Sequence, residues 1–371
     1  MTALFWCSVS IVFYAYFGYP LALALLRAVR ERPVARSEDE PAVTMVVPVH
    51  NQPVDIRKKI ENTLSLDYPP EKLRLVVSSD GSTDATNEVV RSFADRGVVL
   101  VSSDERSGKV AAQMRALSSI QGRIAIFTDA SILLNREALR AIVRPFADPA
   151  VGCVSSEDHV PGGGEGLYVR YEMWLRRMEG SIRTLIGVSG SFYAIRTNLI
   201  EETPIRYTRD FLVPLTVIEK GYRVLSEPDA QGHFLPAVSA GSEFQRKVRT
   251  VMRGMDVLWY RRRLLNPFRF PFVSFALVSH KIFRWAVPIA MTAAFFANLP
   301  LLAAGPVYVL TFAAQLGLYA LGAAAFFLPR VQNLLPAKAA LFFLVTNGAI
   351  LLAWIRYLSG ERAVVWKPTE R

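Results

Sequence analysis

The sequence predicts an α/β domain built on a parallel sheet, with membrane-crossing helices at both ends of the chain. Between about residues 44 and 230, short apolar runs alternate with amphipathic stretches, the pattern of strands that alternate with helices. Before and after this region lie apolar runs of about 20 residues, the length needed to cross the hydrocarbon of a bilayer.

The first apolar run covers about residues 4–26 and carries no charge. A signal peptide is the competing interpretation, but the segment has no basic cluster before it and no obvious small-residue cleavage site. Four arginines follow directly: Arg27, Arg30, Arg32 and Arg36. Because basic residues stay on the cytoplasmic side, we expect a transmembrane helix over residues 1–28 with its amino terminus outside.

A cytoplasmic domain is predicted over residues 41–235. The runs predicted as buried strands are 43–49, 73–78, 98–101 and 124–128. The stretches predicted as helices between them are 55–66, 84–95 and 109–120. In parallel sheets with helices on both faces, ligands bind at the carboxyl ends of the strands, so we expect the chemistry there.

The stretch 243–263 combines apolar residues at helical spacing with many basic residues. This pattern is typical of a basic amphipathic helix in the membrane interface, and we assign residues 240–285 to such helices. A solvated helix packed on the α/β domain is the alternative. The apolar piece 269–285 is interrupted by His280, Lys281 and Arg284, which favours an interfacial rather than a spanning segment.

About three transmembrane helices are predicted within residues 286–360, over 286–304, 306–328 and 339–358. Three crossings place the last residues outside. The basic residues near the carboxyl end favour the inside instead: Arg356, Arg362, Lys367 and Arg371. The sequence leaves this conflict open.

Composition excludes several functions. The net charge of +11 does not indicate nucleic-acid binding, because the basic residues crowd beside apolar segments and no nucleic-acid motif accompanies them. Cys7 and Cys153 are too far apart for a disulfide framework or zinc spacing, and the four histidines are scattered singly.

Acidic residues follow two predicted strands. Asp80 stands at the tip of the second strand, before the turn at Gly81, and Asp84 can cap the next helix. Asp129 follows the fourth strand, with the hydroxyl of Ser131 two residues later. Oxygen ligands of this kind can hold a hard divalent cation that also binds a diphosphate.

In order along the chain, these pieces resemble the inverting glycosyltransferase family that includes cellulose synthase and hyaluronan synthase. The matching segments are Pro48-Val49-His50-Asn51, Ser79-Asp80-Gly81-Ser82-Thr83-Asp84, Gly108-Lys109-Val110-Ala111-Ala112, Asp129-Ala130-Ser131, Arg209-Asp210-Phe211 and Lys220-Gly221-Tyr222-Arg223-Val224. The resemblance implies a GT-A type, Rossmann-like domain that binds a nucleotide sugar.

The resemblance also implies roles for individual residues. Asp210 would be the general base that deprotonates the acceptor hydroxyl. The donor would be bound by Pro48, Val49, His50, Asn51, Asp80, Lys109, Asp129, Arg246 and Arg249. The acceptor side would be bordered by Ser189, Gly190 and Ser191. Magnesium or manganese would be held by Asp129 and Ser131.

The sequence departs from the family pattern at four places. Ser79 replaces the first acid of one signature, and Ser131 replaces the second metal acid. Arg209 replaces the acid before Asp210, where its charge could bind phosphate. Thr250 stands where processive members carry the tryptophan of Gln-x-x-Arg-Trp, which favours limited transfer over long-chain polymerisation.

We therefore expect an integral membrane enzyme of a bacterial-type cell membrane, with its catalytic domain in the cytoplasm. It would transfer a sugar with inversion from a nucleoside-diphosphate sugar, UDP-linked in most of the family, to a glycan or lipid-linked acceptor. The alternative is a catalytically impaired relative that serves as a membrane partner in polysaccharide assembly; the four replacements motivate it.

Overall fold

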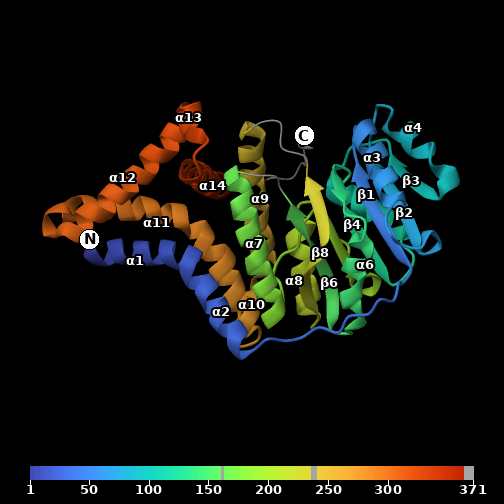
Figure 1. Ribbon diagram of the computed structural model, residues 1–371, viewed down its shortest axis with the longest axis horizontal. Coiled ribbons are helices and arrows are strands. Elements are labelled where there is room, and N and C mark those ends of the chain that lie inside the picture. Colours follow the sequence, from blue (N-terminus) through green and yellow to red (C-terminus); the bar gives the residue numbers. More distant parts are fainter. Residues whose placement is uncertain (160–162, 235–239, 363–371) are drawn as a thin grey trace.

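The computed structural model describes residues 1–159, 163–234 and 240–362. Figure 1 shows two parts: an α/β domain, and an arm of long helices that carries the amino terminus at its far end. Helices α7 (Gly163–Ile182) and α9 (Ala240–Tyr260) stand between the arm and the sheet. The chain is therefore divided as the alternation of apolar runs predicts.

The described residues form an eight-stranded sheet in the order β3-β2-β1-β4-β7-β6-β8-β5. Its strands are β1 (Val43–Val49), β2 (Leu73–Asp80), β3 (Val98–Ser103), β4 (Ile124–Thr128), β5 (Ile132–Leu134), β6 (Val151–His159), β7 (Phe192–Arg196) and β8 (Arg223–Phe234). Strands β1 to β4 are parallel, as expected, and two of the predicted ranges, 43–49 and 124–128, match the strands residue for residue.

The sheet is mixed, which the expectation of a parallel sheet missed. Strand β7 runs antiparallel to β4 and β6, and β5 runs antiparallel to β8. The cause lies in the segment before β7. The Leu185 N–H donates to Val224 O near the start of β8, and the Asp129 N–H donates to Ser191 O at the opposite edge. The segment before β7 therefore crosses to the carboxyl edge of the sheet, and β7 must run from that edge in the antiparallel direction.

Helices cover both faces of the sheet. The short and medium helices of the domain are α3 (Pro53–Leu64), α4 (Thr86–Arg91), α5 (Lys109–Arg115), α6 (Ala138–Val143) and α8 (Arg209–Glu219). On β1, Met45 and Val47 point into the core beneath α3, α4 and α6, whereas Val46 points into the core on the α8 side. This alternation is the two-residue period of a strand buried on both faces.

Among the described residues, four helical segments are long and apolar enough to span a membrane. They are Thr2–Val29, Pro271–Ala304, Pro306–Phe327 and Leu335–Leu358. The first contains α1 (Thr2–Phe13), the π-helical η1 (Tyr14–Gly18) and α2 (Tyr19–Val29). The second contains α10 (Pro271–Ala276), the π-helical η8 (Leu277–Ile282), α11 (Phe283–Asn298) and η9 (Leu299–Ala304). The others are α12 (Pro306–Phe327) and α14 (Leu335–Leu358), joined through α13 (Pro329–Gln332).

The second segment differs from the expected separation of 269–285 from the span after it. Residues from Pro271 onward form one continuous helical run. Its first part is buried in the core of the α/β domain through Val273, Ala276 and Leu277. The domain and the arm therefore share a core.

Helix α9 buries its apolar stripe against protein. Val248 and Met252 pack on Ala349 and Ala353 of α14, while Met255 and Leu258 join the core of the α/β domain. The apolar side that predicted a lipid contact is thus covered by α14 and by the α/β domain.

Helix α14 lies against the elements between the domain and the arm. Near its start, the ring of Phe342 contacts that of Tyr168 on α7, with centroids 5.2 Å apart. Beyond its end, Arg362 pairs with Asp256 of α9 at 3.5 Å. Two of the carboxyl-terminal basic residues, Lys367 and Arg371, lie outside the residues that the structure describes.

Candidate functional site

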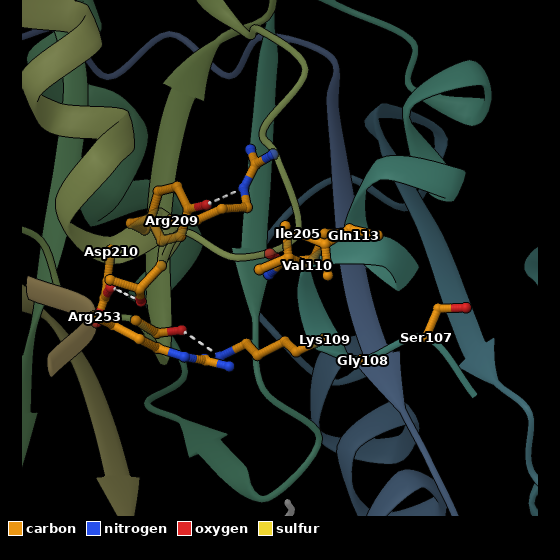
Figure 2. A pocket seen from close by; sticks show the side chains of 12 residues that line it. Ser107, Gly108, Lys109, Val110, Gln113, Ile205, Arg209, Asp210 and Arg253 are labelled. Carbon is orange, nitrogen blue, oxygen red and sulfur yellow. Dashed lines mark hydrogen bonds between the residues drawn. The ribbon is translucent and has the colours of Figure 1, made fainter. Parts of the chain in front are cut away.

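The residues expected to carry chemistry gather at the carboxyl edge of the sheet. Asp129 follows β4, Gly190 precedes β7, and Asp210 stands in the first turn of α8. A pocket opens between these elements (Figure 2). Its lining consists of Ser107, Gly108, Lys109, Val110, Gln113, Gly190, Tyr193, Ile205, Thr208, Arg209, Asp210 and Arg253.

Lys109 links two sides of the pocket. Its Nζ lies 2.5 Å from Asp129 Oδ1 and donates a hydrogen bond to Gly190 O at 3.0 Å. The side chains of Lys109 and Asp129 are only 20% and 28% exposed, so solvent screens this ion pair weakly. The predicted donor residue Lys109 therefore stands beside the predicted metal residue.

Asp210 is held in place by its surroundings. The hydroxyl of Thr208 donates to its carboxylate, and the Val188 N–H donates to its carbonyl at 2.9 Å. A Cβ placed on Gly190 would lie 3.2 Å from Asp210 Oδ2, so a larger residue there would crowd the carboxylate. A general base must reach the hydroxyl of a bound substrate, and a carboxylate held at the wall of a pocket is placed to do so.

Arg253 is a pocket residue that the sequence analysis missed. It comes from α9, and Figure 2 shows its guanidinium and the ammonium of Lys109 pointing toward one another. Burial lowers the pKa of Arg253, the charge of Asp210 raises it, and Arg249 lowers it further. Two cations that converge in this way favour an anion between them.

The predicted donor residues Arg246 and Arg249 lie on the same face of α9 as Arg253, because spacings of four and seven residues repeat one helix face. Neither of them lines the pocket described above. The spacing was the signal that could have identified Arg253.

Arg209 lines the pocket but does not face Asp210, so its expected contact with phosphate stays a prediction. Its guanidinium lies 4.5 Å from the ring centroid of Phe127, and its Nε donates to Tyr193 Oη at 3.1 Å. Figure 2 shows it extending away from Asp210. A planar guanidinium stacks well on an aromatic face, which explains why this arginine is only 4% exposed.

Asp80 stabilises the turn before α5 through hydrogen bonds. Its Oδ1 accepts the Ser107 N–H at 3.0 Å, and its Oδ2 accepts the Gly108 N–H at 2.6 Å. These bonds fix the turn that leads directly into Lys109. The predicted contact of Asp80 with a nucleotide base stays a prediction.

The predicted donor residues Pro48, Val49, His50 and Asn51 end β1 beside that turn. Pro48 and Val49 are strand residues paired with β2, and Val49 is buried. His50 Nδ1 lies 2.7 Å from Asp80 O. Asn51 has a φ of 49° and accepts the Thr83 N–H through its side chain at 2.9 Å. The ends of β1 and β2 are thereby tied into one rim.

Of the three predicted acceptor residues, only Gly190 lines the pocket. The hydroxyls of Ser189 and Ser191 both donate to Asp158 Oδ1, at 2.7 and 2.8 Å. The two serines are buried and fix the loop that presents Gly190. Asp158, which ends this network on β6, carries no local motif that would have marked it.

Comparison with known proteins gives the family. The sequence model for Glycosyl transferase family 2 matches residues 44–201. The α/β domain belongs to glycosyl transferase family 2.

Relatives extend the family 2 match beyond that domain. A poly-beta-1,6-N-acetyl-D-glucosamine synthase of Staphylococcus aureus is 23% identical over 269 residues, covering 69% of this chain and 63% of that protein. The chain thus spans less than two thirds of this relative. Glycosyltransferase AglE of Haloferax volcanii is 30% identical over 129 residues, covering 33% of this chain and 42% of that protein.

A solved structure resembles nearly the whole chain. The mannosyltransferase PcManGT of Pyrobaculum calidifontis, in complex with GDP-Man and Mn2+, superposes with a TM-score of 0.74 at 26% identity. The match covers 96% of this chain and 100% of that one. The helices outside the family 2 domain therefore have counterparts in a solved protein.

The donor set at Asp129 fits a hard divalent cation in part. Asp129 Oδ1 is buried and makes no hydrogen bond of good geometry within the described ranges, although Lys109 is near. Carboxylate and hydroxyl oxygens are suitable ligands for magnesium or manganese. Within the part of the chain that the structure describes, no three acidic, histidine or cysteine side chains gather as a metal site. A diphosphate would have to complete the ligand set.

Lys59 supports the turn around Asp129 from below, and sequence reasoning missed it. Its fully buried Nζ donates to Thr128 Oγ1 and Ile132 O, both at 3.0 Å. These contacts hold the end of β4 against the start of β5, on either side of Asp129. Burial lowers the pKa of Lys59 to about 7, and the charge of Asp129 opposes that shift.

Proposed function

We propose that this chain is a membrane glycosyltransferase that moves a sugar from a nucleoside-diphosphate sugar to a glycan or lipid-linked acceptor, with inversion. The observation that carries the proposal is the convergence of Lys109, Arg253 and Asp210 on one pocket beside Asp129. Cations for a diphosphate and a carboxylate for an alcohol are the two needs of sugar transfer.

The roles follow from position. Asp210 accepts the proton of the acceptor hydroxyl, whose oxygen forms the new bond to the anomeric carbon. The bond from that carbon to the diphosphate oxygen breaks, and the nucleoside diphosphate leaves with the electron pair. Lys109 and Arg253 stabilise the negative charge that develops on the leaving group. Attack on the face opposite the leaving group inverts the anomeric centre.

Asp129 and Ser131 would hold magnesium or manganese together with the donor's diphosphate. When bound, such a cation supplies charge neutralisation for the leaving group. The mannosyltransferase of similar fold was solved with Mn2+, which supports this assignment. Ser131 is a weaker ligand than a carboxylate, so we expect weaker metal binding than an Asp-x-Asp pair gives.

The experiment is a donor panel on the detergent-purified full chain, with membrane extract as acceptor and with or without manganese. UDP-N-acetylglucosamine and GDP-mannose are included because the relatives' names suggest them. We expect nucleotide release from one donor, dependent on metal and lost in Asp129→Ala. Asp95→Ala, at an exposed position away from the pocket, is the control. Product NMR reports the anomeric configuration.

Folded protein that releases nucleotide from no donor, even with acceptor membranes, would contradict the proposal. It would favour the alternative of a catalytically impaired partner in polysaccharide assembly. The replacements Ser131 and Arg209 motivate that alternative, but Arg209 lies away from the catalytic carboxylate.

A further inference from the structure

A buried polar cluster lies where the domain meets the helical arm, and we call it the polar joint. It consists of Tyr19, Glu172, Glu179, His280 and Arg284. His280 bridges the two glutamates, with 2.9 Å from Nε2 to Glu172 and 2.6 Å from Nδ1 to Glu179. Arg284 Nη1 reaches Glu172 at 2.7 Å. The cluster connects α2, α7, the π-helical η8 and α11.

Cationic groups around the polar joint have unmet hydrogen-bonding capacity. Within the described ranges, Arg284 Nε and Nη2 and Arg176 Nη1 are buried without a hydrogen-bond partner. The ammonium of Lys281 lies beside them in the polar region, 5.6 Å from the ring centroid of Phe211. Buried donors of this kind are rarely left unpaired in folded proteins.

The charges are also unbalanced. Among the described side chains, the three cations Arg176, Lys281 and Arg284 lie near the two carboxylates of Glu172 and Glu179. Bound water could satisfy the open N–H groups, but it could not balance the charge. An anion would do both.

The position of this excess positive charge connects it to the pocket. Lys281 packs on Phe211, which directly follows Asp210 in α8. The uncharged stretch of the arm begins just after Arg284, where polar head groups meet the hydrocarbon in a bilayer. Tyrosines surround Arg284, as is common at that level: Tyr16, Tyr168 and Tyr171.

We propose that Arg176, Lys281 and Arg284 bind a phosphoryl group on the lipid portion of the acceptor. This inference rests on the proposed function and gives its acceptor a chemical class, a lipid phosphate or diphosphate. Two planar guanidinium groups and one ammonium match the several oxygen acceptors of a phosphate. The lipid chain extends along the arm, and the sugar end reaches toward Asp210.

Binding of farnesyl phosphate to the full chain in neutral detergent tests the site directly, with thermal stabilisation as the readout. Farnesol is the uncharged control ligand, and inorganic phosphate and phosphatidylglycerol are tested as further ligands. The variants are Lys281→Met and Arg176→Gln. Arg170→Gln is the control, because Arg170 is an exposed arginine on α7, the helix that carries Arg176.

We expect farnesyl phosphate to stabilise the wild type and Arg170→Gln alike. Its affinity for each site variant should fall by at least about tenfold. Farnesol and inorganic phosphate should have little effect. Unchanged binding in both site variants, or equal stabilisation by farnesol, would overturn the proposal. Equal binding of phosphatidylglycerol would assign the site to a structural lipid and overturn its link to the acceptor.

This readout does not need turnover, so it separates the two proposals. If the wild type binds farnesyl phosphate but releases nucleotide from no donor, the proposed function fails and the anion site stands. If nucleotide release occurs and the site variants bind and transfer as the wild type does, the anion site fails alone. Arg176→Lys, which keeps the charge, should bind more tightly than Arg176→Gln, and this order checks that lost charge rather than misfolding causes the effect.

Discussion

The pocket and the polar joint both place cations near carboxylates, but their surroundings differ. In the pocket, Lys109 and Asp129 are partly exposed and pair directly. In the joint, Glu172 is shared between His280 and Arg284 in a buried cluster. Partly exposed groups can exchange partners when a substrate arrives, whereas a buried cluster fixes helices relative to one another. The comparison predicts that changes in the pocket act on turnover and that changes of the joint's buried glutamates act on stability.

The largest stability effect is expected from Glu172→Gln. Breaking a buried ion pair from one side costs about 3–5 kcal/mol, because the partner charge stays buried without compensation. Thermal inactivation in detergent measures the loss, and Glu61→Gln, at an exposed position on α3, is the control. A melting temperature equal to that of the control would contradict the claim that the polar joint stabilises the protein.

The same carboxylate gives a pH dependence. Burial alone would raise the pKa of Glu172, but His280 and Arg284 hold it well below the ordinary value of 4.5. A depressed carboxyl pKa adds stability above the ordinary pKa and loses it as pH falls further. We therefore expect the difference between wild type and Glu172→Gln to be constant above about pH 5 and to shrink below it, measured by thermal unfolding across pH.

In the pocket, Arg253→Met should lower kcat/KM by about 10- to 100-fold, the range for loss of a charge-assisted hydrogen bond. Its melting temperature should stay close to that of the wild type. Steady-state nucleotide release measures the first quantity, and Arg263→Met, exposed beyond the end of α9, is the control. A stability loss without a turnover loss would show that Arg253 supports the structure of the pocket and takes no part in the reaction.

A smaller effect is expected from Arg209→Met, even though Arg209 lines the same pocket. Its guanidinium stacks on Phe127 and bonds to Tyr193, so the change should cost about 1–2 kcal/mol of stability. Turnover per folded molecule should stay near that of the wild type. A turnover loss as large as that of Arg253→Met would show that Arg209 takes part in the reaction after all.

The contacts of α14 also predict its membrane topology. A helix of 24 residues is about 36 Å long, so a crossing would separate its ends by a bilayer. Phe342, in the first third of the helix, and Arg362, just beyond its end, instead contact α7 and α9. We expect α14 to lie along the cytoplasmic side, with residue 359 on the same side as the domain.

Cysteine labelling of sealed vesicles tests this in a Cys7→Ser background. Ser359→Cys should react like Ser65→Cys in the domain, and Thr2→Cys should report the opposite side. These three positions are exposed in the structure. Labelling of Ser359→Cys together with Thr2→Cys would instead support a third carboxyl-terminal crossing.

The sequence predicted local features well. Strands 43–49 and 124–128 matched because continuous apolar runs ending at polar turns are a local signal. Asp84 was expected to cap its helix; it accepts the Thr86 N–H at 3.0 Å, but it lies one residue before the N-cap, Ala85, so that detail was wrong by one residue. The antiparallel course of β7 was missed because it depends on how the preceding segment crosses the sheet, which no local pattern records.

For the candidate site, too, the sequence predicted the residues with a local signal and missed those that depend on distant contacts. Lys109, Gly190 and Asp210 reached the pocket, since each stands at a strand or helix end whose position follows from the fold. Arg253 was missed because α9 is distant in sequence and its orientation depends on α14. The polar joint was missed for a similar reason: His280 lies 101 residues from Glu179.

The most direct test of the central claim is sugar transfer by Asp210→Asn, measured beside donor binding by the same preparation. A general base contributes about 10²- to 10⁴-fold to rate, so we expect kcat to fall by that factor while donor binding is retained. That result would establish Asp210 as the base of an inverting transfer. Turnover near the wild-type rate by folded Asp210→Asn would contradict the account and require another residue, or another function, for this pocket.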